Sequence, residues 1–263
     1  IVALGVSFLM LTGSLDFSVG KVYAFAGVVC ALLYKAGISI WISVLISVLA
    51  CIGISMITGY ISMKFGIPML IVSIAMMQVV DGLNMILTDG ATIYGLPESI
   101  KFLGQNYILG IPVAVIVFAV LALIVAFILN KTYLGRYLFA VGGNNETARL
   151  SGIHVNKIKM IASILWGIAG IIMMSRSFSG SPYSGSNIGN DVISAAVLGG
   201  VSISGGTGKT SGVVTGVLII GVLSQGLVMI GLSSNYQNMI KGAVLILAVI
   251  MDTRSKIVKK ASA

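Results

Sequence analysis

Residues 38–61 read ISIWISVLISVLACIGISMITGYI, an apolar run without a single charged side chain. A helix needs about 20 such residues to cross the hydrocarbon core of a bilayer. An open sheet would leave backbone groups unpaired in lipid, and the alternating pattern of an outer-membrane barrel is absent, so helices are expected. Similar apolar runs recur along the whole chain, at residues 1–11, 22–34, 67–87, 108–129, 160–174, 212–232 and 239–251.

The amino-acid composition also indicates a membrane protein. Of the 263 residues, 57% are hydrophobic and 9% are charged, whereas a soluble domain carries about 25% charged residues. The net charge of +9 comes from basic residues scattered between apolar runs, so membrane lipid is an expected partner and nucleic acid is not. Cys30 and Cys51 lie inside apolar runs and are expected to pack, not to form a disulfide framework.

Two basic segments predict the topology of the chain. Because cytoplasmic loops are enriched in Lys and Arg, both the loop 131–159 and the C-terminal tail are predicted to be cytoplasmic. An even number of crossings must then join them, although only three long apolar runs are evident. The basic residues in question are Lys131, Arg136, Arg149, Lys157 and Lys159 in the loop, and Arg254, Lys256, Lys259 and Lys260 in the tail.

Two interruptions suggest helices that break inside the membrane. Residues 191–204, DVISAAVLGGVSIS, are the best candidate for the missing crossing, but they are short and lead into Gly205-Gly206-Thr207-Gly208. Residues 12–20, TGSLDFSVG, interrupt the first part of the chain in the same way. Irregular backbone survives at membrane depth only where protein or a water-filled cavity covers it, so both are predicted to be broken or re-entrant helices near a pathway. Gly212 and Gly216 form a GxxxG pair that predicts tight helix packing.

The sequence favours a non-enzymatic role. Residues 201–210, VSISGGTGKT, end like a phosphate-binding P-loop, but Ile203 stands where that motif requires its first glycine, so no ATPase site is expected. The single histidine, His154, has no nearby carboxylate or thiol cluster, and the acidic residues within apolar runs have no recognisable catalytic context. Neither a metal nor another cofactor is predicted for this chain.

The loop GGNNETARLSGIHVNKIK, residues 142–159, predicts a short helix between two spans. Asn144 or Asn145 can cap it, Glu146 lies in its first turn, and Gly152 suits its left-handed end. From these residues alone, an interhelical connector and a docking element for a partner are equally acceptable.

Three parts of the sequence resemble a known family. GRYLFAVGGNNETARLSGIHVNKIK, from Gly135, is similar to the coupling segment of ribose-type ABC importer permeases, and LTGSLDFSVG, from Leu11, is similar to their TGGIDLSVG block. The C-terminal half is similar as well. The resemblance implies an all-α membrane protein, a polytopic helical bundle of about 8–10 transmembrane helices in the full protein. Residues 1–263 would form a single transmembrane permease domain whose first segment is expected to be missing, with 131–159 as its cytoplasmic coupling loop.

The same resemblance implies a subunit of a sugar importer in the bacterial inner membrane. Its partners would be a second permease subunit, identical or similar, a periplasmic sugar-binding protein, and cytoplasmic ATPase subunits that bind the ATP and Mg. Alternating access would move a monosaccharide or a related small sugar. The implied ATPase-coupling residues are Asn145, Glu146, Ala148, Arg149 and Gly152.

Four polar residues near the interruptions are candidates for the substrate pathway, since hydroxyl, amide and carboxylate groups can exchange hydrogen bonds with a sugar: Asp16, Ser18, Asn84 and Asn190. Each of them can equally be a helix cap or an interhelical hydrogen bond, and for Asp16 a cap of the run from Val22 is favoured. The alternatives are a secondary, ion-coupled transporter, which would show a repeated pair of broken helices, and an intramembrane enzyme or sensor. No internal repeat is evident in the sequence.

Overall fold

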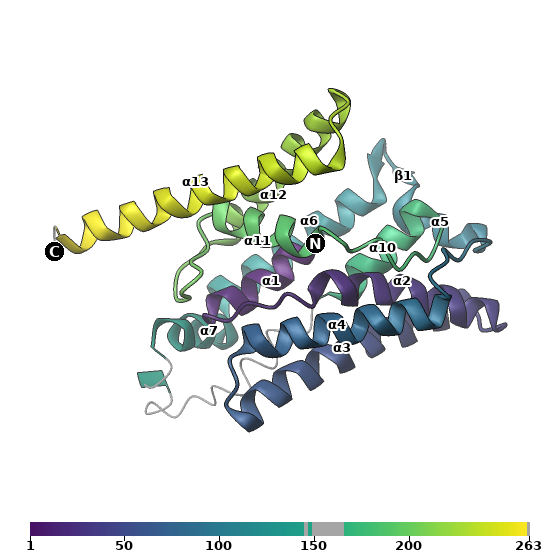
Figure 1. Ribbon diagram of the computed structural model, residues 1–263, viewed down its shortest axis with the longest axis horizontal. Helices are drawn as coiled ribbons and strands as arrows, with labels where there is room; N and C mark the ends of the chain where they lie inside the picture. Colours follow the sequence, from purple (N-terminus) through teal and green to yellow (C-terminus); the bar gives the residue numbers. More distant parts are fainter. Residues whose placement is uncertain (145–146, 149–165, 262–263) are drawn as a thin grey trace.

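The computed structural model describes residues 1–144, 147–148 and 166–261. This part of the chain is almost entirely helical, which confirms the predicted all-α class (Figure 1). The helices are α1 (Val2–Leu11), α2 (Val19–Lys35), α3 (Ile40–Phe65), α4 (Met69–Thr88), η1 (Glu98–Ile100), α5 (Lys101–Gly104), α6 (Val113–Lys131), α7 (Tyr133–Gly143), α10 (Gly167–Ser177), α11 (Ile188–Leu198), α12 (Thr210–Met229) and α13 (Ser234–Ala261). The two-residue strands β1 (Tyr107–Ile108) and β2 (Ile111–Pro112) form a hairpin.

Among the described helices, α3, α4, α6 and α12 are long and apolar enough to cross a membrane. They expose large apolar side chains, with Ile86 75% exposed, Leu123 71% and Val222 72%. Apolar side chains presented continuously along helices of this length fit hydrocarbon as the solvent. The chain is therefore a multi-pass membrane protein. The expectation of about 8–10 crossings in the full protein stays a prediction.

The centre of the bundle is α1, an apolar helix in which all ten residues are buried. A helix that is hydrophobic all round belongs in the interior, and α1 packs against α6, α7, α11 and α12. A second core lies between α2, α3, α4 and α10. Cys30 and Cys51 are buried as free cysteines, and Cys51 Sγ lies 3.4 Å from the Val22 carbonyl oxygen.

Two helices at the core are too short to cross a bilayer alone. With a rise of about 1.5 Å per residue, α1 and α11 each span roughly half of a hydrocarbon core of about 30 Å. The broken helices predicted at both interruptions are confirmed. The crossing expected at residues 191–204 needs a correction, since its helix starts earlier and ends at Leu198. Gly200 follows with a positive φ of 79°, which suits a glycine and ends the helix.

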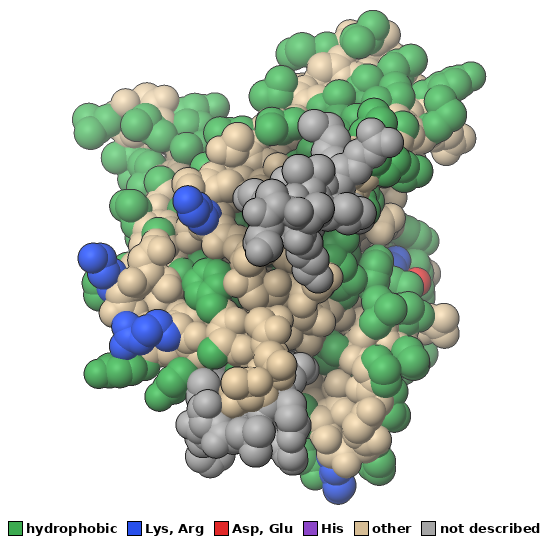
Figure 2. Space-filling model, turned by 90° about the vertical axis from the view of Figure 1, so that its left-hand side faces the viewer, with side chains coloured by type: hydrophobic (Ala, Val, Ile, Leu, Met, Phe, Trp, Pro, Cys, Tyr) green, Lys and Arg blue, Asp and Glu red, His purple; other side chains and the backbone are tan. Residues whose placement is uncertain are grey.

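The molecule has two distinct ends. The turn between α3 and α4, the helix α7 and the last residues of α13 lie at one end, here called the loop end (left in Figure 1). The β1–β2 hairpin and α5 lie at the other end, here called the hairpin end. The helix α7 and the last residues of α13 therefore lie at the same end of the molecule. The even number of crossings between the segment 131–159 and the C-terminal tail stays a prediction, because residues 149–165 lie outside the described part of the chain. Figure 2 looks onto the loop end and shows Lys and Arg side chains at several points, with apolar side chains around them.

Candidate functional site

Two irregular segments enter the bundle from opposite ends. Residues 12–18 start at the loop end, where Gly13 packs beside Ser204 and Gly205, and lead inward to α2. Residues 178–187 start at the hairpin end, where Gly180 exchanges two backbone hydrogen bonds with Ile93, and lead inward to α11. The segment 12–18 comes from the loop end, and α2 after it runs on toward the hairpin end (Figure 1). The segment 178–187 comes from the hairpin end, and α11 after it runs on toward the loop end. The two helices therefore start close together inside the bundle and run in opposite directions. We call both of them half-helices for this reason, although α2 has 17 residues and α11 has 11.

The starts of these half-helices touch through glycine backbones. A Cβ atom on Gly20 would collide with the Gly185 carbonyl oxygen, and one on Gly185 would collide with the Gly20 carbonyl oxygen. We call this contact the half-helix junction. The helix starts also share local sequence, Ser18-Val19-Gly20 in α2 and Asn187-Ile188-Gly189 in α11. This similarity is limited to three residues, and the expectation that the sequence has no evident internal repeat stays a prediction.

The start of α2 is sealed. Asp16 and Ser18 are fully buried, and Asp16 Oδ1 accepts hydrogen bonds from the Ser18 backbone N–H (2.7 Å) and hydroxyl (2.6 Å). The cap predicted at Asp16 needs a correction, because Ser18 is the N-cap residue of α2 and no side chain makes a capping bond there. Asp16 instead closes a turn just before the helix, which is a structural role. The Phe17 N–H donates to Ser73 Oγ at 3.1 Å, which fastens the same turn to α4.

The remaining predicted pathway residues also lie at the half-helix starts. Asn84 of α4 is fully buried, and its Nδ2 donates to the Lys21 carbonyl oxygen at 3.1 Å, in the first turn of α2. Asn190 lies in the first turn of α11 and is exposed. The structure thus brings Asp16, Ser18 and Asn84 together around α2, while Asn190 stands alone on α11. A role for these residues in a pathway stays a prediction.

Two ion pairs at the same starts were missed in the sequence. Lys21 Nζ of α2 lies 2.8 Å from Asp81 Oδ1 of α4, and Lys241 Nζ of α13 lies 2.9 Å from Asp191 Oδ2 of α11. The available signal was a single charge inside an otherwise apolar run, since ionisable residues in membrane helices usually have partners. Which of these charges pair depends on which helices are neighbours, and the sequence alone does not show that.

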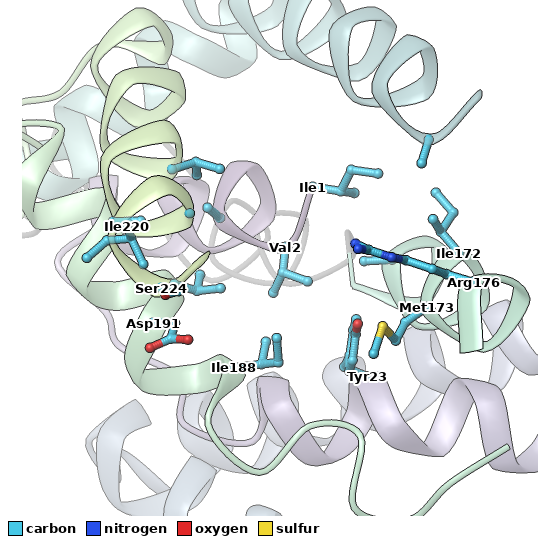
Figure 3. Close-up of a pocket in the computed structure, with 17 residues that line it drawn as sticks. Ile1, Val2, Tyr23, Ile172, Met173, Arg176, Ile188, Asp191, Ile220 and Ser224 are labelled. Atoms are coloured by element: carbon cyan, nitrogen blue, oxygen red, sulfur yellow. The ribbon is translucent and has the colours of Figure 1, made fainter. Parts of the chain in front are cut away.

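A cavity of about 330 Å³ lies between α1, α2, α6, α10, α11 and α12. Figure 3 shows Arg176 and Tyr23 on one side of it and Asp191 on the other, with apolar side chains between them. Ile1 and Val2 form part of its wall. Four polar side chains line this cavity, those of Tyr23, Arg176, Asp191 and Ser224, and the rest of the lining is mostly apolar. The half-helix junction is the candidate for a functional site.

Three segments meet at the loop end in what we call the triple contact, formed by Leu11, Gly142 and Gly206. The Gly206 N–H donates to the Leu11 carbonyl oxygen at 3.0 Å. Gly142, near the end of α7, packs so closely that a Cβ atom would collide with that carbonyl oxygen and lie 2.5 Å from Gly206 N. The triple contact therefore joins the end of α1, the segment after α11, and the helix that leads into the predicted coupling loop.

The first residues of that loop have the predicted cap. Asn144 Oδ1 accepts a hydrogen bond from the Thr147 N–H at 3.0 Å, so Asn144 has the capping position that was left open between two asparagines. Ala148 is buried. The other implied coupling residues, Asn145, Glu146, Arg149 and Gly152, lie outside the described residues. Within the described part of the chain, no three His, Cys, Asp or Glu side chains group closely enough to hold a metal ion.

These features define the class: a polytopic helical membrane protein with a pair of inverted half-helices. The chain belongs to the family described as branched-chain amino acid transport system, permease component, which matches residues 1–249. It is therefore a transport permease, and the resemblance to ribose-type ABC importer permeases is confirmed by the relatives that follow.

The ribose import permease protein RbsC of Bacillus subtilis (strain 168) is 37% identical over 260 residues, covering 97% of this chain and 81% of that protein. RbsC of Escherichia coli (strain K12) is 36% identical over 264 residues, covering 97% of this chain and 82% of that protein. The L-arabinose transport system permease protein AraH of Escherichia coli (strain K12) is 38% identical over 255 residues, covering 95% and 78%. No solved structure matches the chain.

Proposed function

We propose that this chain is a membrane-spanning subunit of an ABC importer and that it carries a pentose, with D-ribose as the first candidate, into a bacterial cell. The observation that supports this most is the similarity, over nearly the whole chain, to permeases named for ribose and for arabinose. The inverted half-helices add a structural reason. Interrupted helices that meet inside the bundle are where a solute can pass helix termini and polar groups at membrane depth.

Alternating access would act at the half-helix junction. Gly20 and Gly185 touch through backbone atoms only, so no bulky side chain locks the two helix starts together. Asp16, Ser18, Asn84 and Asn190 would provide the hydrogen bonds that replace water around sugar hydroxyls as the starts separate. Three of these residues are buried in the present conformation, which corresponds to a closed pathway.

The loop end is proposed to be cytoplasmic. Its described basic residues have no acidic neighbours in the same turns: Lys64 at the end of α3, Lys131 at the end of α6, Arg136 in α7 and Lys209 before α12. The hairpin end carries both signs, with Asp89 and Glu98 beside Lys35, Lys101 and Arg176. An excess of positive charge marks the cytoplasmic side, which would be that of the inner membrane, and would leave the hairpin end to a periplasmic sugar-binding protein.

Energy would come from separate ATPase subunits that hold the ATP and Mg. In the segment that resembles a P-loop, the N–H groups of Ser202, Gly205 and Gly206 donate to the carbonyl oxygens of Thr207, Ser202 and Leu11. These groups are used within the fold and do not form an open cradle for phosphate. Asn145, Glu146, Ala148, Arg149 and Gly152 would dock on the ATPase, and a second permease copy or a similar subunit would complete the pathway.

An ion-coupled carrier is the second candidate, since two interrupted helices meet inside the bundle at Gly20 and Gly185. The relatives argue against it, because RbsC is named an import permease and a further relative, AraH of Azospirillum brasilense, is named an ABC transporter permease. The energy source separates the two candidates. ABC import stops when ATP is depleted and persists in the presence of a protonophore, whereas ion-coupled uptake stops with the protonophore.

The test is uptake of radiolabelled D-ribose and L-arabinose by cells that lack other pentose transporters and express the full-length permease with its ATPase and binding protein. ATP-dependent uptake of either pentose supports the proposal. Purification should also recover the ATPase with the wild-type permease and lose it with Glu146→Lys or Gly152→Arg. Absence of pentose uptake with the ATPase still bound would reject the substrate. Uptake without any bound ATPase would reject the ABC mechanism.

A further inference from the structure

Each half-helix carries one charged side chain in its first turn. Each of these side chains forms an ion pair with an opposite charge on the second helix further along the chain. Lys21 of α2 pairs with Asp81 of α4, and Asp191 of α11 pairs with Lys241 of α13. The order of helices is the same in both cases, and the signs are reversed. These two pairs therefore occupy corresponding places at the starts of the two half-helices.

Both pairs lie where an unpaired charge would be costly. Asp81 is inside α4, one of the helices long and apolar enough to cross the membrane, and Lys21 and Asp191 lie in the first turns of the half-helices, beside the junction. The Asp81 and Asp191 side chains are 38% and 26% exposed, and Lys21 and Lys241 are 17% and 12% exposed. Charges at this depth turn away from lipid, toward a partner or a water-filled space.

The helix dipole makes the two pairs unequal. The N-terminal end of a helix stabilises an anion and destabilises a cation. Asp191 in the first turn of α11 is therefore favourable even without its lysine. Lys21 in the first turn of α2 is unfavourable, so it depends on Asp81.

We propose that the two ion pairs are positioning contacts for transport: Lys21–Asp81 holds the start of α2 on α4, and Asp191–Lys241 holds the start of α11 on α13. Together they set the distance between Gly20 and Gly185 at the half-helix junction. The inference rests on the proposed transport function. It adds four positioning residues, namely Lys21, Asp81, Asp191 and Lys241. Only Asp191 lies in one of the two interruptions that the sequence analysis singled out. The inference also predicts that charge complementarity matters more than the identity of each residue.

The experiment is a charge-exchange cycle in the full-length permease assembled with its ATPase and binding protein. The single variants are Lys21→Asp, Asp81→Lys, Asp191→Lys and Lys241→Asp, and each is combined with its partner to restore an opposite pair. Three quantities are measured: the amount of folded permease in the membrane, its thermal unfolding temperature in detergent, and the uptake of radiolabelled D-ribose per ATP hydrolysed.

Each single exchange is expected to lower uptake per ATP about tenfold or more, since it places like charges together at membrane depth. Each double exchange is expected to recover most of that loss and of the unfolding temperature. Milder neutral variants test the dipole argument. Asp81→Asn leaves Lys21 unpaired at a positive helix end and should be worse than Lys241→Met, which leaves Asp191 at a favourable one.

A matched control is the ion pair at the hairpin end, where Lys101 Nζ lies 2.7 Å from Glu98 Oε1. Lys101 lowers the pKa of Glu98, first through this hydrogen bond and then through its charge. Glu98→Gln should leave the unfolding temperature unchanged, because the Glu98 side chain is 88% exposed and an exposed pair contributes little. Uptake is not compared for this control, since the hairpin end is the proposed face for the binding protein.

The outcomes separate the two levels of the proposal. If the double exchanges are no better than the sums of the single ones in both stability and uptake per ATP, the ion pairs do not position the half-helices and the inference is overturned. If stability recovers and uptake per ATP does not, the pairs are only structural, and the transport role is overturned. If the wild type moves no pentose, the proposed substrate fails, whereas the unfolding temperatures still decide whether the pairs couple.

Discussion

The starts of α2 and α11 share a local sequence and touch each other, yet their surroundings differ. At α2, Asp16, Ser18 and Asn84 are fully buried and hydrogen-bonded to the first residues of the helix or its turn. At α11, Asn187 and Asn190 are exposed. The start of α2 is thus buried and fixed by hydrogen bonds, whereas the start of α11 exposes its polar side chains.

The helices that follow explain part of this difference. On α11, the backbone is approached directly by α12, where Cβ atoms on Gly212 and Gly216 would collide with the carbonyl oxygens of Gly199 and Ala195. This confirms the tight packing predicted from the GxxxG pair. On α2, side chains from α4 cover the helix start. Both half-helices also have glycine contacts along their length, since a Cβ atom on Gly170 of α10 would collide with the Tyr23 carbonyl oxygen of α2. The difference lies at the starts, where polar side chains of α4 cover α2 only.

The largest expected effect comes from Gly20, the glycine at the second position of α2. Gly20→Ala places a Cβ atom against the Gly185 carbonyl oxygen and 3.4 Å from Gly189 N, and backbone atoms cannot rotate away. We expect a loss of about 3 kcal/mol in the unfolding free energy in detergent, and pentose uptake should fall at least about tenfold, because the two helix starts can no longer meet in their wild-type geometry.

Gly189→Ala is the matched control for that change. Its Cβ atom would meet only the Phe17 carbonyl oxygen, at 3.8 Å, which is an ordinary contact. Since Ala is favoured over Gly inside a helix by about 0.5–1 kcal/mol, the variant should be as stable as the wild type or slightly more so. Equal damage from Gly20→Ala and Gly189→Ala would mean that the two starts are equivalent, and the comparison would be wrong.

Gly142→Ala tests whether the interruption at residues 12–20 and the segment after α11 move together. Gly142→Ala disturbs the triple contact, because its Cβ atom would collide with the Leu11 carbonyl oxygen. We expect a loss of about 2 kcal/mol in unfolding free energy and uncoupling of ATP hydrolysis from uptake, measured in reconstituted vesicles. Gly143→Ala is the control, since no atom lies within 4 Å of its Cβ position. If both variants transport like the wild type, α7 does not link the coupling loop to the interruptions.

Much of the fold could be predicted from the sequence because a bilayer selects for length and apolar composition. The runs at residues 38–61, 67–87 and 212–232 became α3, α4 and α12 within a few residues. The run at 108–129 began too early, because Leu109 and Gly110 have positive φ angles and form the turn of the hairpin. Helix and turn compete for such residues, and hydrophobicity alone cannot separate them.

The candidate site was only partly predictable. Polar, glycine-rich interruptions are visible in a sequence, so residues 12–20 and the segment after Asp191 were found. The half-helix junction was not, because a contact between Gly20 and Gly185 leaves no pattern in either segment. The same reason hid both ion pairs. Asp81 and Lys241 are visible as single charges in apolar runs, but their partners depend on the packing of helices far apart in the chain.

The smallest expected effect separates packing from a pathway role. Asn84→Ala removes a buried hydrogen bond to the Lys21 carbonyl oxygen and leaves a small cavity, so the unfolding free energy should fall by about 2 kcal/mol. Asn190→Ala changes an exposed side chain, and its effect on stability should stay within about 0.5 kcal/mol. Any loss of transport in this second variant therefore reports on the solute and not on folding.

For Asn190→Ala we expect a rise of a few fold in the apparent KM for D-ribose uptake with little change in the maximal rate, because one hydrogen bond to a passing sugar contributes about 1 kcal/mol. Asn84→Ala should instead lower the amount of folded permease and leave the KM of the remainder unchanged. A normal KM for Asn190→Ala combined with a raised KM for Asn84→Ala would reverse the assignment. In that case the sealed start of α2 would be the part of the half-helix junction that opens to the solute.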